Sequence, residues 1–326
     1  MEERPQNKLK LLEIQDLLLR ETDDEHHLTV QEIIDHLAAK GMKSERKSIY
    51  LYMELLEAYG MDIINDKEQQ NRYHVGNRLF QLAELKLLVD AVKFAKFITA
   101  EKSSELITKL KSLTSVHEAE RLERNDWIYN RLKSKNNAVY LNVDAIHEAI
   151  LKQRLIRFKY FDYDLDKEIV FRKQGEFYKA IPVFLCWDDE KYYVIVYHES
   201  HKDYTIYRLD KMREVSMLKI KHEHQADLEG IEHYCAGLFH MYTGNQQRVT
   251  LNFHESLVNV VFDRFGLDVE IHKQSDGWFI ITENISISPT FFAWIVQFGD
   301  KAMIQSPGST RNELIELCQK SLRQYE

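Results

Sequence analysis

Proline, glycine and cysteine are all scarce in this chain of 326 residues. It holds 4 prolines, 11 glycines and 3 cysteines, which excludes a collagen-like or low-complexity chain. Cys186, Cys235 and Cys318 lie far apart. An odd number of cysteines without C-x-x-C spacing argues against a disulfide framework and against a zinc site. We therefore expect reduced thiols and a cytoplasmic location.

Long apolar runs are absent as well. No run approaches the roughly 18 residues that a membrane span requires, and the first residues lack the apolar core of a signal peptide. The residues present are 44% hydrophobic, 29% charged and 11% aromatic, which excludes a mostly disordered chain and is typical of a globular protein. At about 150 residues per domain, the length predicts two domains or three small ones.

The net charge of −8 would by itself argue against binding of nucleic acid. One segment departs from this average: residues 40–53 carry four basic side chains and one acidic side chain. Salt screens charges beyond roughly 10 Å, so a small basic face on an acidic protein can still bind phosphates.

Residues 1–77 show the pattern of three helices and a hairpin. We expect helices over 8–20, over 30–39 after a capping box from Thr29 to Glu32, and from an N-cap at Ser44 to Tyr59. Strands at 63–64 and 72–75 form the hairpin. This order predicts a winged helix-turn-helix domain that spans 1–77.

Residues 78–153 read as a helical connector. Apolar residues recur at helical spacing over 79–132, which predicts two or three helices, and a last helix covers about 143–153. Neither glycine nor proline occurs between Gly76 and Gly175. The pattern indicates a rigid connector or a dimerisation element.

From residue 154 the hydrophobic period changes to two. Short strands are expected at 156–160, 169–173, 177–180, 183–187, 192–198, 205–209 and 214–218. Antiparallel strands at this spacing predict a small, bent sheet or barrel over 154–240, which ends in a helix at 227–241. Residues 241–326 then read as strand, helix, strand, strand, helix, strand and a tail helix, a ferredoxin-like βαββαβ plan. The fold class is therefore a multidomain α+β protein.

Several motifs resemble those of WYL-domain transcriptional regulators. The run Ser44-Glu45-Arg46-Lys47-Ser48-Ile49-Tyr50 resembles that family's recognition helix, and residues 80–88 resemble its connector helix. The runs at 178–182, 192–194 and 207–212 resemble the core of the WYL domain. In this chain the Trp-Tyr-Leu signature stands as Tyr192-Tyr193-Val194, and Tyr52 stands where many members have an Asp.

The resemblance implies a fold and a function for each part. The first domain would be a winged helix-turn-helix that binds duplex DNA, and the WYL domain would form an Sm-like or SH3-like barrel. The C-terminal extension would help the chain to form a homodimer, for which the segment around Phe291, Phe292 and Trp294 offers apolar surface. The WYL domain would sense an anionic effector, such as a nucleotide or single-stranded nucleic acid.

The candidate DNA contacts lie at the start of the third helix and in the hairpin. A recognition helix places its first turns in the major groove, where Arg or Lys reaches guanine O6 and N7. The alternative is a solvated helix face. The candidate residues are Lys43, Ser44, Arg46, Lys47, Ser48, Tyr50 and Arg72.

The candidate effector contacts are Tyr178, Tyr193, His198 and Arg208. An Arg inside a small aromatic sheet is costly unless it is paired, so Arg208 would bind phosphate or carboxylate, or form a salt bridge to Asp210. The two tyrosines would stack a base or pack in the core. His198 would contact the ligand, or lie on the surface together with His201.

The sequence offers no catalytic constellation. We find no Walker pattern, no G-x-S-x-G and no EF-hand spacing, so we expect no enzyme activity, no cofactor and no metal. The expectation is a homodimeric regulator that binds a double-stranded operator and responds to an effector. The alternative is an accessory protein that binds RNA or single strands without regulating transcription.

Overall fold

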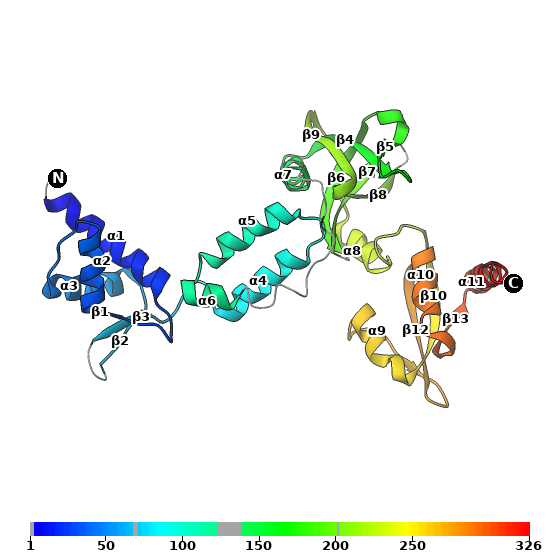
Figure 1. The fold of residues 1–326 in the computed structure, drawn as a ribbon. Helices are drawn as coiled ribbons and strands as arrows, with labels where there is room; N and C mark the ends of the chain where they lie inside the picture. The colour runs from blue at the N-terminus through cyan, green and yellow to red at the C-terminus, as the bar shows by residue number, and fades with distance from the viewer. Residues whose placement is uncertain (1–2, 68–70, 123–132, 134–137, 189, 201) are drawn as a thin grey trace. The chain divides into compact units, whose positions relative to one another are not determined.

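The computed structural model describes residues 3–67, 71–122, 133, 138–188, 190–200 and 202–326. The chain divides into two compact units, residues 1–137 and 138–326. It is a mixed α/β protein in which helices come first and antiparallel sheets follow (Figure 1). Within the described residues, no helix is both long and apolar enough to cross a membrane.

The first unit begins with three helices and a small sheet. The helices are α1 (Glu3–Glu21), α2 (Val30–Ala39) and α3 (Arg46–Tyr59). The strands are β1 (Leu28–Thr29), β2 (Ile63–Asp66) and β3 (Arg72–Val75), in the antiparallel order β1-β3-β2. The expected helices and hairpin are thus present, and the two-residue strand β1 is an addition that the sequence did not reveal.

Apolar residues at helical spacing hold α1, α2 and α3 together. Ile14 and Leu18 from α1 pack with Ile33 from α2 and with Ile49 from α3, and all four side chains are fully buried. The capping box from Thr29 to Glu32 forms as expected.

The start of α3 differs from the sequence prediction. The helix begins at Arg46, with Glu45 in place of Ser44 as its N-cap residue, and Glu45 makes no side-chain capping hydrogen bond. The Ser44 hydroxyl is instead buried without a hydrogen-bond partner. Gly60 ends α3 with a left-handed φ of 110°, a conformation that glycine adopts without strain.

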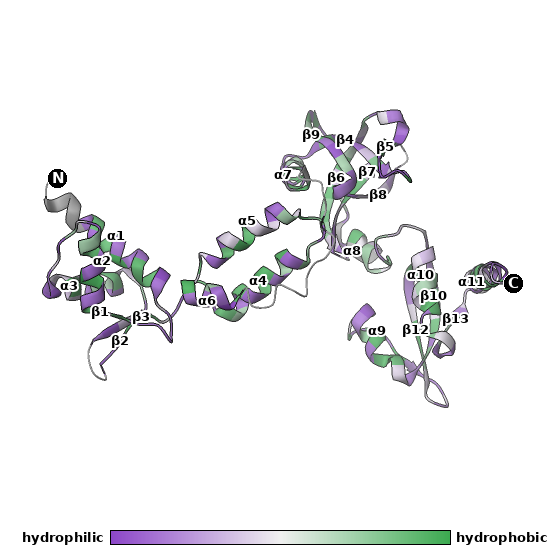
Figure 2. Cartoon of the chain, in the orientation of Figure 1, coloured by the Kyte–Doolittle hydropathy of each residue, from purple (hydrophilic) through white to green (hydrophobic). Residues whose placement is uncertain are grey.

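The connector in the described residues contains α4 (Leu82–Phe94), α5 (Ala100–Lys111) and α6 (Val116–Arg121). Thr99 and Ser115 cap α5 and α6 with their hydroxyl oxygens. Each helix carries both hydrophilic and hydrophobic residues, as amphipathic helices do (Figure 2). Part of the helical stretch expected at 79–132 lies outside the described residues.

The second unit begins with α7 (Ala138–Leu151), which starts five residues before the predicted helix. A six-stranded antiparallel sheet follows, in the order β5-β4-β6-β7-β8, with β9 also paired to β4. Its strands are β4 (Arg154–Tyr163), β5 (Ile169–Phe171), β6 (Tyr178–Asp188), β7 (Lys191–His198), β8 (Asp203–Arg208) and β9 (Met212–Lys221). Two short 3-10 turns, η2 (Arg172–Gly175) and η3 (Leu209–Lys211), join β5 to β6 and β8 to β9.

Strand β6 corrects the expectation of two strands at 177–180 and 183–187. Pro182 lies inside one continuous strand, and the pairing register with β7 shifts between Pro182 and Phe184. Proline cannot donate to a ladder hydrogen bond, and a bulge is one of the few places where a sheet tolerates it. Bulges also increase the local bend of a strand, as this small sheet requires.

The C-terminal part follows the predicted strand and helix order. After α8 (Leu228–Ala236) come β10 (Asn245–His254), α9 (Val258–Phe265), β11 (His272–Lys273), β12 (Trp278–Ile287), α10 (Pro289–Val296), β13 (Ala302–Ser306) and α11 (Gly308–Leu322). The four strands take the antiparallel order β11-β12-β10-β13. Strand β12 therefore lies between β10 and β11, which is the split arrangement of a βαββαβ plan.

The helix α10 covers the core of this C-terminal sheet. Phe291 is fully buried and Phe292 is 7% exposed, and both belong to a core that contains Phe253 and Ile281. The expectation that Phe291 and Phe292 offer apolar surface for a dimer is therefore wrong, because their side chains stabilise the monomer.

Candidate nucleic-acid interface and effector site

The N-terminus of α3 presents three basic side chains to solvent. Lys43, Arg46 and Lys47 are exposed, and in the described part of the chain none of the three lies within 4 Å of a carboxylate. Ile49 and Met53 on the same helix are buried, so the apolar face holds α3 in place while the basic face stays accessible. Geometry of this kind suits phosphate oxygens and guanine edges.

The remaining candidate DNA contacts differ in accessibility. Ser48 and Tyr50 are partly exposed on the first turns of α3, and Arg72 is exposed at the start of β3. Ser44 is less accessible, because its hydroxyl oxygen is buried. Arg46 lies on α3 and Arg72 lies on β3. Both elements contribute to one packed core, which fixes their relative positions.

Hydrogen bonds to Asp23 order the loop after α1 and join it to the N-cap residue of α6. One oxygen of Asp23 accepts hydrogen bonds from the backbone N–H groups of Glu25 and His26, at 3.0 Å each. The other oxygen accepts from the hydroxyl of Ser115, the N-cap residue of α6. Burial raises the pKa of Asp23, but hydrogen bonds from Ser115, His26 and Glu25 outweigh it and lower the pKa to about 2.

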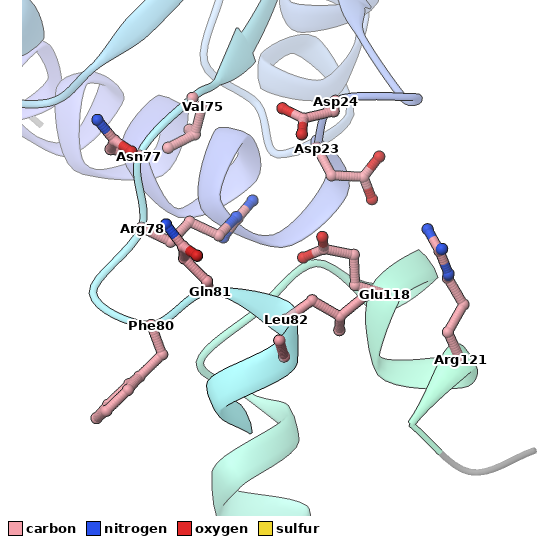
Figure 3. Close-up of a pocket in the computed structure, with 12 residues that line it drawn as sticks. Asp23, Asp24, Val75, Asn77, Arg78, Phe80, Gln81, Leu82, Glu118 and Arg121 are labelled. Atoms are coloured by element: carbon pink, nitrogen blue, oxygen red, sulfur yellow. The ribbon is translucent and has the colours of Figure 1, made fainter. Parts of the chain in front are cut away.

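A cavity of about 500 Å³ opens beside this junction (Figure 3). Asp23, Asp24 and Glu118 line it together with Arg78 and Arg121. The Arg78 guanidinium donates to the backbone carbonyls of Leu19, at 2.7 Å, and of Thr22. These carbonyls lie at the C-terminal end of α1, where a cation is favourable. The end of α1 and the loop after it are thus joined to the connector by polar contacts.

In the second unit, Arg208 forms a bidentate pair with Asp210. Its Nε lies 3.0 Å from one carboxylate oxygen and its Nη2 lies 2.6 Å from the other. Burial lowers the pKa of Arg208, but the Asp210 carboxylate more than offsets this effect, so the pKa lies above its usual value. The salt bridge to Asp210, one of the two alternatives for Arg208, is therefore present.

The other effector candidates are buried. Tyr178 stacks on Phe158 with ring centroids 5.3 Å apart and meets Tyr207 edge-on at 5.6 Å. His198 is 8% exposed, and its Nε2 lies 3.3 Å from the Tyr207 hydroxyl.

Tyr193 is 5% exposed and pairs with Arg208 across β7 and β8. The four candidates thus form two groups, one around Tyr207 and one at Arg208. The surface position considered for His198 is wrong, and His201 lies outside the described residues.

The sequence prediction missed a set of cations that lie over aromatic rings beside β4 and β6. The Arg157 guanidinium lies 4.8 Å and the Lys159 ammonium 5.0 Å from the centre of the Phe177 ring. Lys173 lies 4.2 Å from the Tyr178 ring and Arg172 lies 5.2 Å from the Tyr160 ring. The cations come from β4 and η2, and the rings come from β4, from Phe177 just before β6 and from Tyr178 at its start. The local sign of this surface in the sequence was the alternation of cations with aromatic residues in β4.

Partial neutralisation limits the charge of this surface. Asp162 accepts hydrogen bonds from both Arg172, at 2.6 Å, and Lys211, at 2.5 Å. Glu214 pairs with Lys159 at 2.6 Å. Lys173 has no such carboxylate among the described residues. Within the same residues, no group of three or more His, Cys, Asp or Glu side chains is placed to hold a metal ion.

Comparison with known proteins assigns two parts of the chain. A family model described as the WYL domain matches residues 142–217, and one described as the WCX domain matches residues 245–322. No curated protein matches the chain in sequence.

Several solved structures are similar to the chain, among them the following two. Proteasome accessory factor B/C (PafBC) of Arthrobacter aurescens is 18% identical, with 97% of this chain and 49% of that chain covered and a TM-score of 0.30. This chain therefore spans about half the length of PafBC. A CRISPR Cas-related protein is 12% identical, with 98% of this chain and 84% of that chain covered and a TM-score of 0.39.

The two family matches fall on two parts of the second unit. The WYL match covers most of α7 and the bent sheet up to β9, and the WCX match covers the four-stranded sheet with its helices. The chain therefore contains a WYL domain followed by a WCX domain.

Proposed function

We propose that this protein is a DNA-binding transcriptional regulator, in which residues 1–77 form a winged helix-turn-helix and α3 enters the major groove. The observation that carries the proposal is the accessible basic start of α3, where Lys43, Arg46 and Lys47 lack carboxylate partners among the described residues. The hairpin of β2 and β3 would be the wing, with Arg72 on a phosphate.

The direct test is a mobility-shift titration with duplex DNA from upstream of the protein's own gene. Wild type should form a discrete complex that weakens as salt is raised. The variant with Arg46→Ala and Lys47→Ala should lose roughly 1–3 kcal/mol for each base contact removed, or about one unit of salt slope for each phosphate contact. Lys8→Ala with Arg20→Ala is the matched control, because both residues are exposed cations on α1.

The outcome that contradicts the proposal is equal loss in the two double variants. Such a result would show that only net charge matters, and α3 would then not be the reading helix. Unchanged affinity in the Arg46 and Lys47 variant, with the fold intact by circular dichroism, would lead to the same conclusion.

The WYL domain, in this proposal, is an Sm-like or SH3-like barrel that senses an anionic effector such as a nucleotide or a short single strand. Asp210 already holds the Arg208 guanidinium, so an anion that reaches Arg208 must displace that carboxylate. Exchange of one anion for another at a guanidinium provides the two states that a ligand-driven switch requires. Lys173, over the Tyr178 ring, would supply a second positive charge.

Effector binding is tested by titrating the protein with short single-stranded DNA, short RNA and cyclic nucleotides while operator release is followed. Arg208→Ala should keep operator binding and lose the response. Asp210→Asn should strengthen effector binding, because the competing carboxylate is gone. If both variants respond like wild type, Arg208 has only a structural role.

The regulator would act as a homodimer. One DNA-binding domain of this size contacts few base pairs, and a dimer that binds both halves of a two-fold symmetric operator has a higher affinity for DNA. Light scattering at micromolar concentration should return twice the mass of one 38.8 kDa chain. A single-chain mass in the presence of operator DNA would contradict the dimer.

The second candidate function is binding of RNA or single strands without transcriptional regulation. The observation in its favour is Phe177, 36% exposed between Arg157 and Lys159, since an accessible ring beside cations can stack a base. A protein of this kind would prefer single strands to its upstream duplex, and Phe177→Ala would weaken that binding while Arg46→Ala would not.

A further inference from the structure

A second cavity, of about 700 Å³, lies within the second unit. Trp187 and Asp188 reach it from the end of β6, Phe239 from the loop after α8, Arg264 from α9 and Trp294 from α10. Its volume lies in the range of small-molecule sites. Neither the effector candidates nor the DNA-binding candidates line it.

The parts that form this cavity are tied together by packing and hydrogen bonds. Cys186 in β6 and Cys235 in α8 belong to one apolar cluster. The Arg264 Nη2 donates to the carbonyl oxygens of Ala236, at 2.9 Å, and Leu238, at 2.7 Å. The segment after α8 is thereby fixed to α9, and the cavity has a defined wall.

The charge of Arg264 is not balanced within the described residues. Its guanidinium is half-buried and lies 4.2 Å from the centre of the Phe239 ring, and no carboxylate there lies within 4 Å of it. Burial lowers its pKa, and the more distant Asp188 only partly opposes this effect. A half-buried guanidinium that donates only to neutral carbonyls retains affinity for an anion.

Aromatic rings also contribute to the wall. The Trp294 ring lies 5.1 Å from the Phe239 ring, and the 49% exposed Trp187 completes the aromatic lining. Flat apolar surfaces of this kind favour a planar ligand.

The loop at the cavity also carries backbone strain. His240 and Met241 both have a positive φ, 52° and 56°, in a turn closed by a hydrogen bond from Tyr242 to Phe239. Two adjacent non-glycine residues in this region are costly, and such strain tends to gather at binding sites.

We propose that this cavity binds a small planar aromatic carboxylate, with the carboxylate on Arg264 and the ring between Trp187, Trp294 and Phe239. The proposal is independent of the proposed function, because binding is measured on the protein alone. Asp188, which also lines the cavity, would disfavour an anion, so its removal should strengthen binding.

The test uses three probes of equal ring size: 2-naphthoate, neutral 2-naphthalenemethanol and cationic 2-naphthylmethylamine. Isothermal titration of the full chain should show 2-naphthoate bound roughly tenfold more tightly than the alcohol, because one charge-assisted pair is gained. The amine should bind most weakly. Trp187→Leu should weaken all three probes, and Asp188→Asn should tighten 2-naphthoate alone.

Asp263→Asn is the matched control, since Asp263 is exposed beside Arg264 in sequence and does not line the cavity. It should leave binding of 2-naphthoate unchanged. Arg264→Lys keeps the charge without the two carbonyl hydrogen bonds and should reduce the preference for the carboxylate. If this variant does not fold, the Asp188→Asn and Trp187→Leu variants still test whether the probes bind in this cavity.

Preference for the amine, or equal binding of the acid and the alcohol, would overturn the proposal. If neither Trp187→Leu nor Asp188→Asn changes the affinity for 2-naphthoate, the probe binds elsewhere, and this result would also overturn the proposal. Because no DNA is present in these titrations, failure here is distinct from failure of operator binding.

Discussion

The hydrogen bonds that converge on Asp23 predict a large and local effect of Asp23→Asn. The carboxylate accepts from two backbone N–H groups, from the His26 ring at 2.7 Å and from the Ser115 hydroxyl. They lower its pKa from 3.8 to about 2 against the effect of burial. At 1.36 kcal/mol for each pKa unit, the folded state gains about 2.5 kcal/mol from the ionised form.

The sign of the pH dependence follows from the direction of the shift. A carboxyl whose pKa is lower in the folded state stabilises the fold above pH about 4, and this contribution is lost as the pH falls toward 2. Asp23→Asn removes the contribution at neutral pH. We therefore expect a loss of about 2 kcal/mol in the local free energy of opening, or roughly 30-fold faster exchange.

The assay is hydrogen exchange of the full chain, read by mass spectrometry on peptides that cover residues 22–28 and 114–122. Corrected for intrinsic rates, exchange in wild type should rise as the pH is lowered from 5 to 3, and the rise should be absent in Asp23→Asn. Asp24→Asn is the matched control, because it removes the same charge from a side chain that is 88% exposed. Equal effects of the two substitutions at neutral pH would refute the reasoning.

Three further predictions concern the second unit. Phe291→Ala should destabilise the C-terminal core by about 3–5 kcal/mol, measured by urea denaturation, because the fully buried ring leaves a cavity. Gly244→Ala should lower the melting temperature, since an added Cβ would lie 1.9 Å from the Ile287 carbonyl oxygen; an unchanged melting temperature would contradict this contact. Arg208→Ala alone should cost more stability than the double change with Asp210→Ala, because the single change removes the bidentate guanidinium from a partly buried carboxylate, and a double-mutant cycle measures the difference.

Element order was largely predictable from the sequence, because apolar periodicity and turn residues act locally. The capping box at Thr29 and the change from period 3.6 to period two near residue 154 placed most helices and strands. Pro182 was misleading, since proline usually ends a strand and here occupies a bulge inside β6. Strand β1 has two residues and carries too little pattern to be detected.

The sites were less predictable, because burial and pairing depend on distant parts of the chain. The basic residues of α3 were found from local charge, and they are exposed as expected. Arg208 was found from its motif, and its pair with Asp210 was one of two open alternatives. Arg264 gave no signal, since its role depends on carbonyl groups more than 25 residues earlier in the sequence.

The contacts of Arg78 bear on how this protein can be divided or recombined. The residue that completes the C-terminal end of α1 is Arg78, 59 positions after Leu19 and beyond β3. A fragment that stops at residue 77 would therefore leave the last carbonyls of α1 to water, and one that stops before Ser115 would also lose the hydroxyl that donates to Asp23. Exchange of the N-terminal three-helix domain between related proteins should succeed when the connector through α6 is exchanged with it, so the transferable unit is longer than the domain for which we propose DNA contact.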